Sequence, residues 1–186
     1  MSEILAALAG NPSSGKSRLS SHLSTTLDIP RVTGSDIIKG WALERGVTLN
    51  KRPDFTAFQL RMRQELGPHC LMEAMLTHRS EAGLIIDGLR NIQDYTMFKE
   101  EGGLTIATWC PLTERFRRAT EGGDQKNTIS SIEIFQQAEA VEYADSSLCG
   151  QHTVTIMQMA DLSIDASRPF DTVRAEVETF LMPSAG

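Results

Sequence analysis

The segment Gly10–Ser17 combines glycines, a lysine and a serine at spacings that could hold the phosphates of a nucleotide. It fits the pattern G-x-x-x-x-G-K-[ST] at every fixed position and directly follows the apolar run Ile4–Ala9. A buried strand that ends in such a turn presents backbone N–H groups, together with the positive end of the next helix, to a polyphosphate. We expect the whole of this Walker A loop to bind a nucleotide. Its residues are Gly10, Asn11, Pro12, Ser13, Ser14, Gly15, Lys16 and Ser17.

Three side chains have more specific expected tasks. Lys16 would carry a mobile positive charge to the β- and γ-phosphates of ATP and take part in catalysis, and the Ser17 hydroxyl would ligate Mg²⁺. A second ligand for Mg²⁺ is expected at Asp87, because the apolar segment Leu84–Ile86 ends in this carboxylate, as a Walker B position requires. An Asp-Gly pair after a strand is also a common turn, so this assignment depends on the loop upstream. The pattern predicts ATP and Mg²⁺ as cofactors.

The rest of the chain alternates short apolar segments with helical ones. Strands are expected at Ile4–Ala9, Gly83–Asp87, Leu104–Thr108 and around Leu162–Ile164. Helices are expected from the loop to Leu27, at about 93–101, from Thr113 onward, after Ser130 and from Phe170 toward Pro183. Such alternation predicts an α/β domain whose mainly parallel sheet is covered on both faces by helices. Ligands of such sheets bind beyond the carboxyl ends of the strands.

Composition limits the classes of protein that this chain can be. With 186 residues, 40% of them hydrophobic, it can bury one sizeable core, which favours a single domain over residues 1–186. The net charge of −6 gives no general attraction to nucleic acid or to an acidic membrane, and no apolar stretch is long enough to span a bilayer. Cys70, Cys110 and Cys149 lie far apart and lack C-x-x-C spacing, so neither a disulfide framework nor a zinc site is expected. These features favour the cytoplasm and no membrane partner.

Four segments, in the same order along the chain, resemble the nucleoside monophosphate kinase group of P-loop proteins, above all its adenylate-kinase-like and dephospho-CoA-kinase-like members. They are the Walker A loop, Thr33–Lys39, Asp87–Arg90 and Pro111–Arg118. The resemblance implies a P-loop NTPase fold with a five-stranded sheet. It also implies a helical insertion that binds the phosphoryl acceptor at residues 33–80, and a short lid over the donor phosphates at residues 112–128.

The resemblance assigns tasks to individual residues as well. Thr33 and Lys39 match positions that hold the acceptor phosphate, and Arg90 matches the arginine of a D-G-x-x-R segment, with a spacing one residue shorter. Arg118 falls near the lid arginine that meets the donor nucleotide and supports catalysis. The lid departs from the family pattern, because residues 119–126 supply acid and glycine with a single lysine, Lys126, where further arginines are usual. Unless Lys126 substitutes for the missing arginine, such a lid implies weak transfer, or a partner or substrate that completes the site.

The chemistry of the acceptor depends on Asp36. If the acceptor presents a phosphate, no protein base is needed; if it presents a hydroxyl, a carboxylate must accept the proton, and Asp36 is the candidate. The same residue, placed just before two isoleucines, could instead be a helix N-cap. Cations and aromatic residues are mixed between Trp41 and Arg63. This mixture suits a phosphorylated, base-bearing acceptor in contact with Arg63, or an exposed nucleic-acid strand.

Three functions remain open at this point. The preferred one is an ATP-dependent phosphotransferase that acts on a nucleotide or nucleotide-like small molecule. The second is a P-loop kinase for a hydroxyl on nucleic acid, such as a hydroxymethylated base in phage DNA, which would have to leave the duplex. The third is a non-catalytic, nucleotide-binding regulatory protein, which the thin lid motivates.

Overall fold

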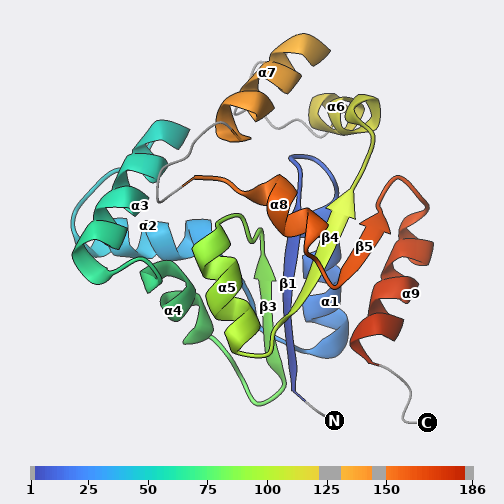
Figure 1. Ribbon diagram of the computed structural model, residues 1–186, viewed down its shortest axis with the longest axis horizontal. Coiled ribbons are helices and arrows are strands. Elements are labelled where there is room, and N and C mark those ends of the chain that lie inside the picture. Colours follow the sequence, from blue (N-terminus) through green and yellow to red (C-terminus); the bar gives the residue numbers. More distant parts are fainter. Residues whose placement is uncertain (1–2, 122–130, 144–149, 183–186) are drawn as a thin grey trace.

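Five parallel strands form the centre of the molecule, in the order β2-β3-β1-β4-β5 (Figure 1). This computed structural model describes residues 3–121, 131–143 and 150–182, except for the side chains of residues 52–53 and 141–143. The expected five-stranded parallel sheet is confirmed. Its strands are β1 (Ile4–Gly10), β2 (Arg31–Thr33), β3 (Gly83–Asp87), β4 (Leu104–Trp109) and β5 (Leu162–Asp165).

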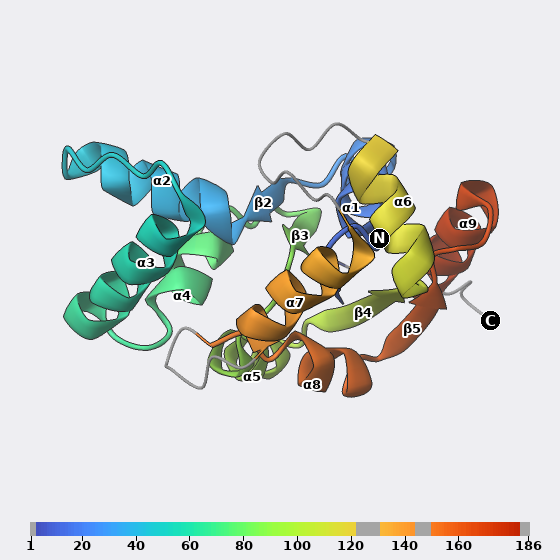
Figure 2. The same ribbon diagram turned by 90° about the horizontal axis from the view of Figure 1, so that it is seen from above.

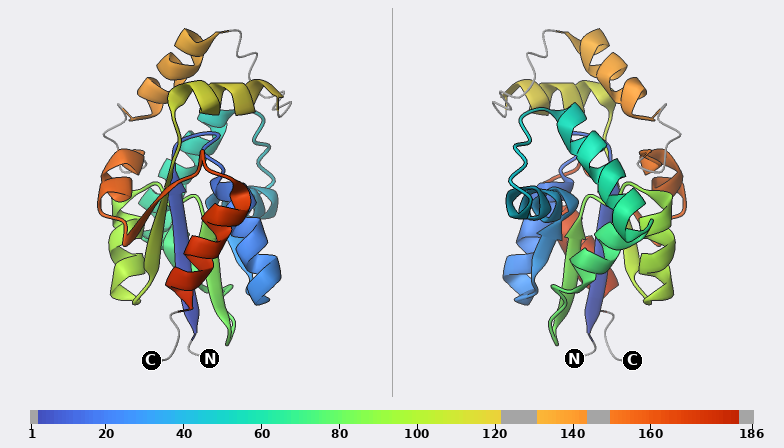
Figure 3. Two further views of the ribbon diagram at one scale, coloured as in Figure 1. Left: turned by 90° about the vertical axis from the view of Figure 1, so that its right-hand side faces the viewer. Right: turned by 90° about the vertical axis from the view of Figure 1, so that its left-hand side faces the viewer.

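Helices cover both faces of the sheet, as the side views in Figure 3 show. One face carries α1 (Lys16–Leu27) and α9 (Phe170–Leu181). The other face carries α5 (Ile92–Glu100) and α8 (Thr153–Gln158). Successive side chains of a strand point to opposite faces. Ala6 and Leu8 of β1 therefore join the core beneath α1 and α9, whereas Ala7 and Ala9 join the core beneath α5 and α8.

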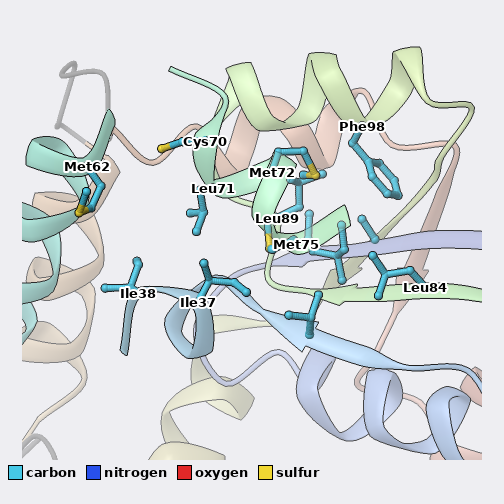
Figure 4. Close-up of a cluster of buried hydrophobic side chains, with 14 of the residues drawn as sticks. Ile37, Ile38, Met62, Cys70, Leu71, Met72, Met75, Leu84, Leu89 and Phe98 are labelled. Atoms are coloured by element: carbon cyan, nitrogen blue, oxygen red, sulfur yellow. The ribbon is translucent and has the colours of Figure 1, made fainter. Parts of the chain in front are cut away.

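Three further helices fill the segment between β2 and β3 and stand beside the sheet (Figure 2). They are α2 (Gly34–Glu44), α3 (Arg52–Leu66) and α4 (Cys70–Leu76). Buried side chains such as Met62, Leu71 and Met72 pack between them and belong to the same core as Phe98 of α5 (Figure 4). Because the core is continuous, packing holds this insertion against the sheet, with α2 starting where β2 ends.

Two helices, α6 (Leu112–Glu121) and α7 (Ile132–Tyr143), lie above the carboxyl ends of the strands (Figure 1). α6 is the described part of the expected lid, residues 112–128, and α7 follows it in the chain. Residues 122–128 lie outside the described residues, as does Ser130. Among the helices that the structure describes, none has the length and apolar character that a bilayer crossing requires.

A buried ion pair joins the insertion to α5. Arg63 of α3 is 2% exposed, and its Nη2 atom donates a hydrogen bond to Oδ2 of Asp94 at 2.6 Å, while Nη1 donates to the carbonyl oxygen of Pro68. Burial raises the pKa of the Asp94 carboxyl, because its loss of water outweighs the attraction to Arg63. The expectation that Arg63 contacts an acceptor therefore gives way to a structural assignment, in which it holds α3 against α5.

Replacing Asp94 with alanine would leave the Arg63 guanidinium buried without its carboxylate. We expect the free energy of unfolding, measured by urea denaturation, to fall by about 3 kcal/mol. The matched control is Asp171→Ala, because Asp171 pairs with Arg174 on the surface with a side chain that is 85% exposed. That change should cost no more than about 1 kcal/mol. Equal stability of the two variants would contradict the structural assignment.

Candidate functional site

The Walker A loop begins where β1 ends, and it is packed against β4. Gly10 is paired with Thr108 in the sheet register. A Cβ atom at Gly10 would lie 2.4 Å from Oγ1 and 2.5 Å from the carbonyl oxygen of Thr108, so only glycine fits. The Thr108 hydroxyl is also hydrogen-bonded to the buried hydroxyl of Ser14 at 2.8 Å. The end of β4 thus fixes both the start and the middle of the loop.

The loop backbone has the shape of an anion cradle. Ser13 and Gly15 have left-handed conformations, with φ of 59° and 96°. A non-glycine residue is uncommon in this region, and such residues cluster at functional sites. Left-handed residues within a turn direct successive N–H groups toward one point. Because Gly15 is the N-cap residue of α1, the positive end of that helix adds to the same field.

Lys16 lies along the loop rather than in solvent. It is the first residue of α1, is 7% exposed, and donates a hydrogen bond from Nζ to the carbonyl oxygen of Asn11 at 3.2 Å. The Lys16 side chain therefore reaches from the end of the loop back to its start. Ser17, the next residue, is exposed on the first turn of the helix.

Asp87 is the last residue of β3, the strand that lies between β1 and β2. It is 6% exposed, and its Oδ1 atom is buried with no hydrogen-bond partner. Its Oδ2 atom accepts a hydrogen bond from Arg31, which also donates from Nε to the Ser20 hydroxyl of α1 at 2.9 Å. A buried carboxylate with one oxygen left over fits the expected role of metal ligand.

A cavity of about 310 Å³ opens beside Gly15, between α1, α6 and the turn that precedes α9. Arg118 contacts this end of the loop and donates from Nη2 to the carbonyl oxygen of Ala166 at 2.8 Å. The Arg18 guanidinium lies 3.9 Å above the centroid of the Phe170 ring. Arginines dominate the cavity wall: Arg18, Arg117, Arg118 and Arg168.

Glu114 fixes the direction of two of these arginines. Hydrogen bonds from Arg117 and Arg118 lower the pKa of Glu114 to about 2. The carboxylate is therefore ionised at neutral pH and holds both guanidinium groups in place.

The helices α6 and α7 contact the start of the loop through a second buried ion pair. Arg115 of α6 donates to both carboxylate oxygens of Glu139 in α7, at 2.5 and 3.0 Å. Glu139 also accepts a hydrogen bond from Asn11 Nδ2 at 3.0 Å, and Arg115 Nη1 reaches the carbonyl oxygen of Pro12 at 3.3 Å. Sequence reasoning missed Arg115 and Glu139 as site residues. Lys126 lies outside the described residues.

The residues expected to bind the acceptor begin at the end of β2. Thr33 is paired with Asp87 in the sheet register. Its hydroxyl donates to Asp36 Oδ2 at 2.7 Å and accepts from the Asp36 N–H at 3.1 Å. Thr33 is therefore the N-cap of α2, and Asp36 lies in the first turn, which corrects the alternative that Asp36 is itself the cap. Lys39 Nζ lies 4.0 Å from Asp36 Oδ1, and both side chains are well exposed.

Arg90 lies beyond the end of β3, where its Nη1 atom donates to Oε1 of Gln151 at 3.2 Å. A Cβ atom on Gly88 would lie 3.8 Å from Arg90 Nε, so the side chain folds back over the turn after Asp87. The structure thus places Thr33, Asp87 and the start of the Walker A loop on adjacent strand ends, with Arg90 just after them.

The fold is similar to that of solved kinase structures. Shikimate kinase from Acinetobacter baumannii in complex with shikimate matches with a TM-score of 0.59 and 13% identity, over 98% of this chain and 96% of that chain. Shikimate kinase from Bacteroides thetaiotaomicron matches at 0.58 and 14%, over 96% and 98% of the two chains. A gluconokinase from Sinorhizobium meliloti 1021 matches at 0.54 and 14%, over 96% and 91%. The chain has the fold of the P-loop kinases.

In sequence, the chain is similar to a UPF0200 protein of Methanosarcina acetivorans. The two are 26% identical over 182 residues, which cover 94% of this chain and 92% of that protein. No protein-family model matches the chain. The solved kinase structures thus confirm the expected likeness to P-loop kinases at the level of the fold.

Gly10→Ala tests the contact between the loop and β4. The added methyl group would collide with the Thr108 backbone and hydroxyl and push the loop out of shape. We expect the affinity for Mg·ATP, measured by calorimetry, to fall at least about tenfold, since loop amides would no longer point at the phosphates.

The control for this variant is Gly40→Ala, because a Cβ atom at Gly40, inside α2, meets no atom within 4 Å. Its affinity for Mg·ATP should equal that of the original chain. If Gly10→Ala also kept full affinity, the Walker A loop would not be the nucleotide site.

Proposed function

We propose that the protein is an ATP-dependent phosphotransferase that moves the γ-phosphoryl group of ATP to a nucleotide or nucleotide-like small molecule. The observation that carries this proposal is the Walker A cradle at the end of β1 beside a buried carboxylate, Asp87, whose Oδ1 atom has no partner. The fold shared with shikimate kinases and a gluconokinase supports a small-molecule acceptor.

On the donor side, the loop amides and Lys16 bind the β- and γ-phosphates, and the nucleoside extends past Gly15 into the cavity beside Arg118. Mg²⁺ bound with ATP would offset the charge of the phosphate oxygens. Ser17 and Asp87 would hold this ion. Among the described residues no group of three His, Cys, Asp or Glu side chains forms a metal site, so the nucleotide and water would complete its ligands.

On the acceptor side, the insertion of residues 33–80 carries Thr33, Asp36 and Lys39 to the edge where Asp87 emerges. Lys39 and Arg90 would hold an anionic group of the acceptor. Asp36 would accept a proton if the attacking group is a hydroxyl, which then forms the new P–O bond as the bond to ADP breaks. The cytoplasm is the proposed place of this reaction, and the two described cysteines, Cys70 and Cys110, are free thiols.

The central test incubates the protein with Mg²⁺ and γ-labelled ATP in the presence of nucleoside monophosphates, nucleosides, dephospho-CoA and DNA with hydroxymethylated bases. We expect label on a small molecule and a loss of transfer of about 100-fold or more in Lys16→Ala, because a charge that stabilises the transition state is removed. Label on DNA would favour the nucleic-acid kinase. ATP binding with no transfer to any acceptor would favour a regulatory protein, and undiminished transfer by Lys16→Ala would contradict the proposed donor site.

Asp36→Asn distinguishes the two acceptor chemistries. With a hydroxyl acceptor, we expect the turnover rate to fall about 100-fold or more, because the proton acceptor is lost. With a phosphate acceptor, the fall should be much smaller, since the attacking oxygen is already anionic. Asparagine keeps the backbone N–H that Thr33 caps, so α2 should remain intact, which circular dichroism would check. A wild-type rate with a hydroxyl acceptor would rule out Asp36 as the base.

A further inference from the structure

We propose that Arg115, held in place by Glu139, is a positioning residue that sets the direction of the Walker A amides from the outer side of the loop. The proposal rests on the proposed function, in that the loop is taken to bind the triphosphate. It gives the helices α6 and α7 a role that does not require arginines of the lid to touch a phosphate.

Two of the arginines of α6 reach two carbonyl groups of the loop. Arg115 Nη1 donates to the carbonyl oxygen of Pro12 at 3.3 Å, and Arg118 Nη1 donates to that of Ser14 at 3.4 Å. Residues three apart share one face of a helix, so α6 lies along the loop and holds it at both points. Arg115 is itself oriented by its Nε atom, which donates to the Cys110 carbonyl oxygen at 3.1 Å.

Holding a carbonyl group fixes the N–H group on the other side of the same peptide bond. In a trans peptide, the C=O of one residue and the N–H of the next point in opposite directions, and the described residues contain no cis peptide bond. With the Pro12 carbonyl turned toward α6, the Ser13 N–H is turned away from α6 and into the cradle. The Ser14 carbonyl and the Gly15 N–H are related in the same way.

Glu139 determines where the Arg115 guanidinium lies. The two side chains are 5% and 7% exposed, and they form a two-pronged pair with distances of 2.5 and 3.0 Å. The same carboxylate accepts a hydrogen bond from Asn11 Nδ2, one residue before Pro12. Breaking such a buried pair is costly, so Arg115 stays against the loop backbone. With its charge matched by Glu139, Arg115 acts on the loop rather than on a phosphate.

The test measures affinities of the full chain for Mg·ATP and for Mg·tripolyphosphate by calorimetry, in the original protein and in Glu139→Gln. Glutamine has the shape of glutamate, but it has one neutral oxygen where Glu139 has two charged oxygens that accept hydrogen bonds from Arg115 and Asn11. We expect the dissociation constant to rise about tenfold for both ligands, because the defect concerns phosphate contacts and not the nucleoside. The amide resonances of Ser13 and Gly15 should shift in a ¹⁵N-labelled sample without ligand.

The matched control is Asp94→Asn, which disturbs the other buried arginine–carboxylate pair, far from the loop in the sequence and on α5. We expect it to lose stability and keep its affinity for both ligands. Arg115→Lys is a second variant that keeps the charge but not the forked donor set, so we expect a rise of about tenfold there as well.

Three outcomes would overturn the proposal. If Glu139→Gln and Arg115→Lys are folded and bind both ligands as the original protein does, the pair does not position the loop. If Asp94→Asn weakens binding equally, the effect is one of general stability. If the original protein binds neither ligand, the proposed function itself is wrong and this inference falls with it.

Discussion

The close approach of β1 and β4 at Gly10 is the constraint on which the site depends. A side chain at position 10 would collide with Thr108. Because Gly10 has none, the chain can leave the sheet there in a tight turn. The same threonine then holds the Ser14 hydroxyl, which keeps the turn closed. Main-chain amides carry only partial charges, so their contribution to the affinity for an anion depends on their direction.

Charge at this edge of the sheet is arranged before any ligand arrives. The buried carboxylates of Asp87 and Glu139 each face an arginine from a distant part of the chain, Arg31 and Arg115. Pairs of this kind add little net stability compared with apolar packing, but removing one member is costly. They therefore fix positions more than they stabilise the fold. A triphosphate that binds here meets a loop that already has its shape, which lowers the cost of ordering it.

The parts of the site that follow from local sequence could be predicted. The Walker A spacing, the apolar strand before Asp87 and the helix from the loop to Leu27 each depend on residues close together in the chain, and the structure has them as expected. Thr33 and Asp36 also have the spacing of a capping pair, but from the sequence only Asp36 was named as an alternative cap, whereas the structure has Thr33 in that position.

The remaining contacts of the site depend on tertiary structure that no spacing reveals. Glu139 lies 128 residues from Asn11, and Arg31 lies 56 residues from Asp87, so nothing local marks these side chains as partners. Arg63 was expected to bind a ligand, but the structure gives it a buried partner within the protein. Its place among cations and aromatic residues suggested an exposed binding face, whereas Asp94 holds it in the interior. A single sequence shows which residues are charged but not which of them the fold turns inward.

The most direct measurement of the central claim compares the binding of ATP and adenosine to the purified chain, with and without Mg²⁺, by calorimetry. If the loop and Asp87 form a triphosphate site, ATP should bind in a magnesium-dependent manner, and adenosine should bind far more weakly. Adenosine that bound as tightly as ATP, or ATP that did not bind at all, would contradict the account.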